Sequence, residues 1–242
     1  MAEPDQSAIA EISAWAEFRA GTVAILPAAV AVIPFALLLG ALAAQKGLSP
    51  LEVGLMSALV FAGSSQLVAV DIWRDPAPWL LLGVTALTIN LRHVMMSASL
   101  SRNLGAFSWF QRVFGMLFLA DEIWALAERR AAQGRLHPAF YAGLAALLYA
   151  NWLIWTVAGA IVGPAVQNPT AWGFDFAFTA IFIGLIVAFW RGNGTALVIV
   201  ASAVSAVAAQ ALLGGVWHVM IGGIVGMVVA LLLALYRREQ PT

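Results

Sequence analysis

The segment Thr88-Ile89-Asn90-Leu91-Arg92-His93-Val94-Met95-Met96-Ser97-Ala98-Ser99 places an arginine, a histidine and an asparagine inside an apolar run long enough to cross a lipid bilayer. A charged side chain near the centre of a membrane costs about 3 kcal/mol on insertion scales. Such a residue usually faces a wet cavity, a polar partner or a substrate path. The segment therefore predicts a bundle of transmembrane helices with a polar site inside it.

The composition also indicates a membrane protein. The 242 residues are 62% hydrophobic and 10% charged, whereas about a quarter of the residues of a soluble domain are charged. A soluble protein of this length could not hide so much apolar surface, so lipid must surround most of it. The formal net charge is zero, which argues against nucleic acid or acidic partners. The chain has no cysteine, so thiolate metal sites and disulfide bonds are excluded, and we expect no metal and no cofactor.

Apolar runs of about 20 residues, the length of a spanning helix, predict an all-α polytopic membrane protein with about eight transmembrane helices, some kinked or discontinuous. We expect one transmembrane domain over 21–236, between a cytoplasmic or interfacial segment (1–20) and a cytoplasmic tail (237–242). Pro27 and Pro34 predict a kink or break in the first helix. The predicted helices are 21–44, 51–72, 79–100, 110–127, 140–162, 174–190, 195–213 and 216–236, with a re-entrant hairpin within 174–215 as an alternative.

Loop charge favours eight crossings with both termini in the cytoplasm, because cytoplasmic loops are enriched in Lys and Arg. In that topology the cytoplasmic side holds eight arginines, and the other side holds Lys46, Arg102 and Arg112. Seven crossings would place Arg237 and Arg238 opposite the basic loop that follows the fourth helix. We therefore predict eight.

The helix predicted over 79–100 carries polar residues on two opposite faces. At 100° per residue, Asn90, His93 and Ser97 share one face, and Arg92 lies on the other. A lipid-facing helix keeps its polar groups to one stripe, so we expect this helix to be enclosed by protein on both sides or broken near Asn90. Arg92 can alternatively extend to the outer headgroups. A buried Arg92 can hold a carboxylate through a bidentate fork.

A second polar cluster, Gly63-Ser64-Ser65-Gln66, lies near the middle of the helix predicted over 51–72. Glycine followed by three hydrogen-bonding side chains can loosen a helix and expose backbone groups, and half-helix ends of this kind bind substrate in discontinuous carriers. A seam of small residues that lets a neighbouring helix approach fits the cluster equally well. The sequence leaves both interpretations open.

Asp121 and Glu122 lie about nine residues into the helix predicted over 110–127, near mid-membrane at a rise of about 1.5 Å per residue. Two adjacent carboxylates there are costly unless one is protonated or paired. They can form a proton- or cation-coupling site, form a salt bridge with Arg92, or lie in a water-filled vestibule at the end of a short helix. The sequence does not separate the roles of the two acids.

Asn151 lies near the middle of the helix predicted over 140–162, flanked by Tyr149, Trp152 and Trp155. Aromatic side chains can line an apolar substrate pocket, although packing and membrane-interface belts are their commoner roles. Asn151 is therefore a candidate substrate-binding residue, with ordinary packing as the alternative.

These residues, in this order, resemble the AzlC family of branched-chain amino acid permeases. The resemblance is dense over residues 20–130 and depends mainly on hydropathy beyond them. The matching segments are Ile33-Pro34-Phe35, Gly40-Ala41-Leu42-Ala43, Gly47-Leu48-Ser49-Pro50-Leu51-Glu52, Phe61-Ala62-Gly63-Ser64-Ser65-Gln66, Asn90-Leu91-Arg92-His93, Ser97-Ala98-Ser99-Leu100-Ser101 and Asp121-Glu122.

The resemblance implies a multi-pass protein of the bacterial inner membrane that exports leucine, isoleucine, valine and, as a further candidate, methionine. It also implies a small second membrane subunit of the AzlD type. The chain has no phosphate-binding glycine loop, which argues against an ATP-driven permease. We therefore expect a proton-coupled secondary transporter rather than an enzyme.

Predicted roles follow from combining these observations. We expect substrate binding by a set of polar residues and proton coupling by the acidic pair or by His93. The candidate substrate-binding residues are Gly63, Ser64, Ser65, Gln66, Asn90, Arg92, Ser97 and Asn151, and the candidate coupling residues are Asp121, Glu122 and His93. Two alternatives are an intramembrane serine hydrolase that uses Ser64 or Ser65 with His93 or His218, and an accessory or channel-forming subunit without transport activity of its own.

Overall fold

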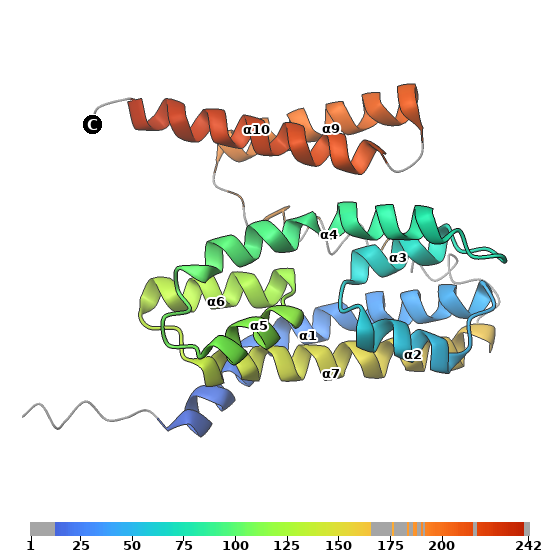
Figure 1. Cartoon of the computed structure of the whole chain (residues 1–242), viewed down its shortest axis with the longest axis horizontal. Coiled ribbons are helices and arrows are strands. Elements are labelled where there is room, and N and C mark those ends of the chain that lie inside the picture. The colour runs from blue at the N-terminus through green and yellow to red at the C-terminus, as the bar shows by residue number, and fades with distance from the viewer. Residues whose placement is uncertain are drawn as a thin grey trace, which may run out of the picture.

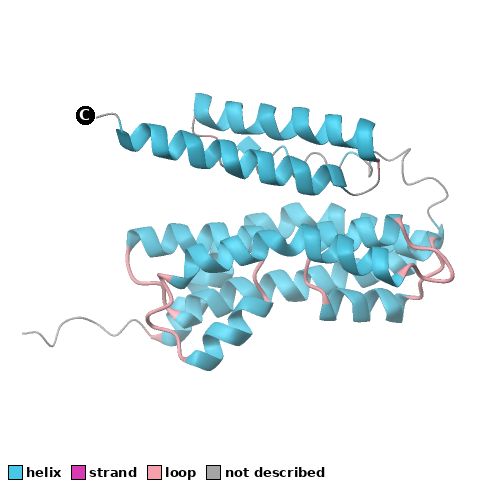
Figure 2. Cartoon of the chain, turned by 45° about the horizontal axis from the view of Figure 1, so that its top comes forward, coloured by secondary structure: helices cyan, strands magenta, loops and turns pink. Residues whose placement is uncertain are grey.

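The computed structural model describes residues 13–165, 192–214 and 217–239, with isolated positions between 176 and 190. Every regular element in these residues is helical, as Figure 2 shows. The prediction of an all-helical membrane protein is therefore confirmed. The helix predicted over 174–190 falls largely outside the described residues, and the number of crossings and the side of each terminus stay predictions.

Among the described residues, four segments are long and apolar enough to cross a membrane: α1 (Ala14–Gln45), α4 (Trp79–Ser101), α7 (Pro138–Val162) with its 3-10 extension η2 (Gly163–Ala165), and α9 (Asn193–Leu213).

Helices α1 and α7 pack against each other along their length (Figure 1). Four glycines lie where the two backbones touch, and we call them the glycine seam. A Cβ atom at Gly40 would lie 2.0 Å from the carbonyl oxygen of Thr156. Close approach of this kind is a main source of helix association in lipid, where no hydrophobic force drives the helices together. The glycine seam consists of Gly21, Gly40, Gly143 and Gly159.

Helix α1 begins at Ala14, within the segment predicted to precede the first membrane helix. It is continuous through Pro27 and Pro34, so these prolines do not interrupt it. Its packing on α7 holds it in the helical conformation despite the hydrogen bonds that the two prolines remove.

Two of the predicted helices are each divided in two. In place of a continuous helix over 51–72, α2 (Pro50–Leu59) and α3 (Gly63–Asp71) are separated by residues 60–62. In place of a helix over 110–127, α5 (Trp109–Leu117) and α6 (Asp121–Gln133) are separated by residues 118–120. The second halves therefore begin at the glycine–serine cluster and at the acidic pair, deep within the bundle.

Capping boxes fix where two of these short helices begin. At the start of α2 the Ser49 hydroxyl accepts a hydrogen bond from the backbone N–H of Glu52, and the Glu52 carboxylate accepts one from the backbone N–H of Ser49. Ser108 and Gln111 form the same reciprocal pair at the start of α5. The S-x-x-E and S-x-x-Q sequences are recognised signatures of this motif.

Helices α9 and α10 (Trp217–Glu239) form an antiparallel hairpin that lies beside the rest of the bundle (Figure 1). They pack mainly against each other, and the Ser202 hydroxyl of α9 donates a hydrogen bond of 2.9 Å to the carbonyl of Gly222 in α10. Contact with the bundle is made chiefly between α10 and α4. The two helices correspond to the predicted helices 195–213 and 216–236.

We predict that Gly159→Ala destabilises the protein by about 1–3 kcal/mol, the usual cost of overpacking a close contact. A Cβ atom there would lie 2.3 Å from the carbonyl oxygen of Leu37 and would push α1 away from α7. Gly83→Ala is the matched control, because Gly83 lies inside α4 with no atom within 4 Å of the added Cβ. The apparent melting temperature in detergent should fall for the first variant and not for the second. Equal melting temperatures would contradict the importance of the glycine seam.

Candidate functional site

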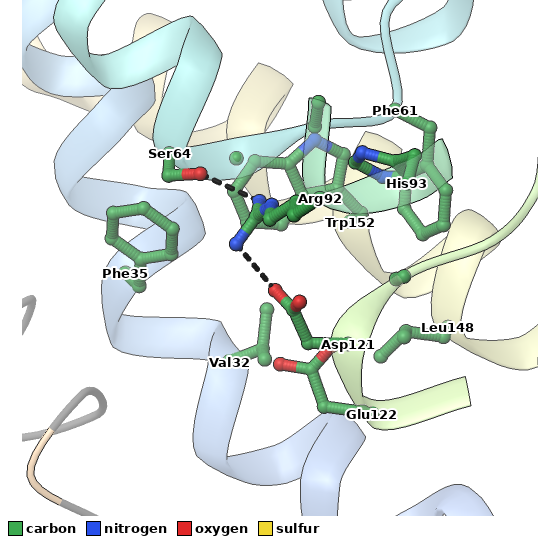
Figure 3. A pocket seen from close by; sticks show the side chains of 13 residues that line it. Val32, Phe35, Phe61, Ser64, Arg92, His93, Asp121, Glu122, Leu148 and Trp152 are labelled. Carbon is green, nitrogen blue, oxygen red and sulfur yellow. Dashed lines mark hydrogen bonds and ion pairs between the residues drawn. The ribbon is translucent and has the colours of Figure 1, made fainter. Parts of the chain in front are cut away.

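A cavity of about 60 Å³ lies where the two helix breaks meet α4, between α1 and α7 (Figure 3). Five segments that are distant in sequence contribute to it. Apolar side chains line it together with a cation, two carboxylates, a histidine and a hydroxyl. The lining residues are Val32, Phe35, Phe61, Ala62, Gly63, Ser64, Arg92, His93, Ala120, Asp121, Glu122, Leu148 and Trp152.

Arg92 connects the two broken helices across the cavity. Its Nη1 lies 2.6 Å from Oδ2 of Asp121 at the start of α6, and its Nη2 donates a hydrogen bond of 2.6 Å to the hydroxyl of Ser64 near the start of α3 (Figure 3). The two charged side chains are 26% and 27% exposed, so the pair is only partly shielded. Arg92 therefore forms the salt bridge that the sequence allowed instead of extending to the headgroups.

The cavity also receives the N-terminal ends of α3 and α6. Neither helix has a side-chain cap, because their N-cap residues are Ala62 and Ala120. The first N–H groups of a helix have no partner within it, and the helix dipole makes this end attractive to negative charge. Asp121 and Glu122 satisfy this preference in the first turn of α6, whereas the first turn of α3 has no acidic residue.

Gly63, the first residue of α3, lies where an added side chain would collide with two aromatic rings. A Cβ atom on Gly63 would lie 2.7 Å from Cη2 of Trp152 and 2.8 Å from Cε1 of Phe35. The rings of Phe35 and Trp152 are themselves in contact, with centroids 5.4 Å apart. The two rings therefore pack closely against the backbone at the start of α3.

Asn90 and Arg92 of α4 carry buried polar atoms that have no hydrogen-bond partner among the described residues, namely the Asn90 Oδ1 and the Arg92 Nε. The His93 Nε2 lies 3.1 Å from the carbonyl oxygen of Leu119, and the backbone of Asn90 is a second, weaker neighbour of the ring. An unpaired buried polar atom costs free energy, so such atoms commonly mark a place for water or ligand. His93 lines the cavity, and Asn90 lies outside its lining.

Ser65 and Gln66 are buried in the protein and do not line the cavity. The Gln66 Nε2 donates to the hydroxyl of Ser57 at 3.1 Å, and the Trp152 Nε1 donates to the Gln66 Oε1 at 3.0 Å. These bonds connect α2, α3 and α7 across the break. In this conformation the Gln66 side chain holds α3 in place and does not face the cavity.

Asn151 and Ser97 also lie outside the cavity lining. The Asn151 Nδ2 donates to the carbonyl of Ala29 at 2.9 Å, and its Oδ1 accepts from the Trp155 Nε1 at 3.1 Å. Asn151 therefore joins α7 to α1. Sequence reasoning did not single out the apolar walls formed by Val32, Phe35 and Leu148, because apolar residues are too common in a membrane protein to be informative.

A second ion pair fixes the far end of α6. Arg130 Nη2 lies 2.7 Å from Oε1 of Glu17 on α1, whose side chain is 5% exposed, and the guanidinium also lies over the ring of Phe140. Glu128 accepts hydrogen bonds from Ser99 and Asn103 near the end of α4. Helix α6 is thus attached at both ends, and its contacts with α4 extend over its length.

The site does not contain the hydrogen bond that a serine hydrolase would need between Ser64 and His93. The Ser64 hydroxyl accepts from Arg92, and the His93 Nε2 lies against a backbone carbonyl. A nucleophilic serine normally lies within hydrogen-bond reach of its base.

The chain matches the family described as AzlC protein over residues 27–166. It belongs to the AzlC family. It is 27% identical to the inner membrane protein YgaZ of Escherichia coli over 92% of this chain and 93% of the relative. It is also 30% identical to an uncharacterized membrane protein of Archaeoglobus fulgidus, over 75% of this chain and 80% of the relative. No solved structure matches the chain.

The matched residues contain the whole cavity, because its lining runs from Val32 to Trp152. AzlC is a transporter-type family, and this membership is consistent with a role in membrane transport and favours a non-enzymatic function. The relatives are membrane proteins by name, one of them of the inner membrane, which agrees with the apolar helices of this chain.

We predict that Arg92 and Asp121 stabilise the fold only as a pair. Arg92→Gln and Asp121→Asn should each lower the unfolding free energy by more than the double variant does, because each single change leaves one charge unpaired in a poorly hydrated place. The coupling energy should be about 0.5–3 kcal/mol. Denaturation of the four proteins in detergent measures it, with Arg102→Gln at the exposed end of α4 as the control. Additive effects would show that the pair contributes nothing.

Proposed function

We propose that the protein is a secondary transporter that exports branched-chain amino acids across the inner membrane, driven by protons. One observation supports this most strongly. An arginine, two carboxylates and two uncapped helix N-termini meet in one cavity inside an AzlC-family membrane protein. Discontinuous helices that meet at a polar site are the usual design of substrate sites in secondary transporters.

The Arg92–Asp121 pair suggests how a zwitterion binds. An amino acid brings one carboxylate and one ammonium group. Its carboxylate would replace Asp121 at the guanidinium of Arg92, beside the Ser64 hydroxyl and the first N–H groups of α3. Its ammonium group would form a salt bridge with the Asp121 carboxylate. Neither protein charge is left alone in this exchange, which avoids the large cost of an unpaired charge.

The apolar lining suits the side chain of a hydrophobic amino acid. Val32, Phe35, Phe61, Leu148 and Trp152 line the same cavity and surround its charged groups (Figure 3). The cavity measures about 60 Å³, whereas pockets for small ligands usually enclose about 300–1,000 Å³. Substrate therefore binds a widened form of this site.

Glu122 is the proposed coupling group. Asp121 is paired with Arg92, whereas Glu122 makes no salt bridge within the described part of the chain, although it lines the same cavity. A carboxylate without a counter-charge in a poorly hydrated site is readily neutralised by a proton. His93 is the second candidate, because its ring lines the same cavity as the two carboxylates.

The proposal includes a small AzlD-type membrane subunit, which the family resemblance implies. Alternatively, this chain has an accessory or channel-forming role and does not transport substrate alone. Reconstitution with and without the small subunit distinguishes the two possibilities.

We predict that vesicles containing the protein export labelled leucine when a pH gradient is imposed, and that Arg92→Ala abolishes this export. The reason is that Arg92 binds both Asp121 and Ser64 and is the only arginine or lysine among the described residues that line the cavity. Arg102→Ala, outside the cavity, should export normally. Normal export by Arg92→Ala would remove the cavity from the mechanism.

We predict that Glu122→Gln uncouples transport from the proton gradient. Leucine exchange between the two sides at equal pH should continue, whereas accumulation driven by the gradient should stop, because the amide cannot carry a proton. Asp121→Asn should abolish both activities, since it removes the partner of the substrate ammonium group. Gradient-driven accumulation by Glu122→Gln would assign the coupling proton to another residue.

A further inference from the structure

A second and larger hollow lies beside the cavity. It is a groove of about 740 Å³ between α5 and α7. The rings of Phe110, Phe114 and Phe118 form one side, and the small residues Ala142 and Ala146 of α7 form the other. Because the alanines are small, α5 and α7 leave open space between them that larger side chains would fill.

The basic groups of this groove lie at one end. Arg135 and His137, in the connection between α6 and α7, line the groove there. The other polar side chains of the lining are Gln111, Tyr141 and Tyr149. Among the described residues that line the groove, none is acidic. The end beside the α6–α7 connection, which we take as its entrance, therefore offers the positive charge of Arg135, and the rest of the groove offers aromatic surface.

A row of three aromatic rings, with Tyr149 in the middle, connects the lining of the groove to the lining of the cavity. Tyr149 lines the groove, whereas its neighbour Leu148 lines the cavity. The Tyr149 ring contacts Phe61, which lines the cavity, with centroids 5.4 Å apart, and Phe118, which lines the groove, with centroids 5.1 Å apart. Both contacts are edge-on, the favoured geometry for aromatic pairs.

The two phenylalanines lie on the two helix breaks. Phe61 belongs to residues 60–62 between α2 and α3, and Phe118 belongs to residues 118–120 between α5 and α6. The Tyr149 hydroxyl donates a hydrogen bond of 3.0 Å to the carbonyl of Ala58 near the end of α2. The row of rings is thus built on the segments of the bundle whose backbone can change most readily, since breaks between elements absorb dihedral changes.

We propose that this groove is the antechamber through which a hydrophobic amino acid reaches the cavity, and that Tyr149, held between Phe61 and Phe118, is the gate between them. The inference rests on the proposed transport function. The positive entrance suits the substrate carboxylate, the aromatic walls suit its side chain, and the row of rings connects the groove to the cavity lining. An amino acid therefore fits the whole groove, whereas a lipid chain would use only its apolar part.

The natural absence of cysteine makes the test direct. Single cysteines are placed in the groove (Ala146→Cys), in the cavity (Val32→Cys) and on an exposed face of α4 outside both (Val94→Cys). A small, charged, membrane-impermeant methanethiosulfonate is added to oriented vesicles on the side of the α6–α7 connection. We expect fast labelling of Ala146→Cys, slow labelling of Val32→Cys and none of Val94→Cys.

The gate is tested by changing Tyr149 in the Val32→Cys background. Tyr149→Ala removes both aromatic contacts and should raise the labelling rate by about tenfold or more. Tyr149→Phe keeps the ring and should change the rate much less. If Tyr149→Ala does not fold, as judged by its elution in detergent, Phe118→Ala takes its place with the same expectation.

Two results would overturn the proposal. One is a Val32→Cys labelling rate that is unaffected when the ring is removed. The other is an Ala146→Cys thiol that reacts with a lipophilic maleimide but not with the charged reagent, which would assign the groove to lipid or to a partner helix. Labelling does not depend on transport, so the gate and the transport function are tested separately. A protein that does not transport leucine can still show the gate, and an active transporter can be shown to lack it.

Discussion

The structure depends on one electrostatic constraint, that a charge inside an apolar bundle must be matched by another. Arg92 satisfies it by reaching Asp121 on α6 and Ser64 on α3. Both partners lie in the first turn of a short helix, so the Arg92 side chain joins the starts of α3 and α6. The cavity is the space that surrounds this pair. Without Arg92, the acidic end of α6 would face the open end of α3 with no cation between them.

The glycine seam is the second determinant of the structure, because it fixes the packing of α1 against α7. Helices α1 and α7 approach so closely that carbonyl oxygens occupy the places of absent side chains. This contact fixes Phe35 and Trp152 against each other, and those rings in turn leave only enough room for a glycine at position 63. The Gln66 side chain then completes α3 by joining Ser57 to Trp152. The rigid pair of long helices thus positions the short ones, whose breaks carry the polar groups.

Sequence reasoning wrongly expected α4 to be enclosed by protein on both sides or broken near Asn90, whereas α4 is continuous over Trp79–Ser101 and its Leu87 and Val94 side chains are 69% and 65% exposed. It did predict the helical membrane class and allow the salt bridge between Arg92 and an acid, because both follow from the cost of polarity in lipid. It could not distinguish a polar residue that faces substrate from one that joins two helices. Gln66 and Asn151 illustrate this limit, since both carry the pattern of a binding residue and both are hydrogen-bonded within the protein. The break at residues 118–120 was not predicted either, because the residues before Asp121 are as apolar as those of a continuous helix.

The same features bear on how a transporter of this design would cycle. An internal salt bridge that a zwitterion can replace lets the empty and loaded sites have the same net charge, so neither state carries an unmatched charge through the membrane. A proton on a separate carboxylate then changes the charge of the site independently of substrate. Glu122 adjoins Asp121 in the chain but is not part of its salt bridge, so binding and coupling can be assigned to neighbouring groups. Breaks between helices are the segments that can absorb dihedral changes, and both breaks place a phenylalanine against Tyr149. A rearrangement that widens the cavity around a bound amino acid must therefore also move the rings that close it.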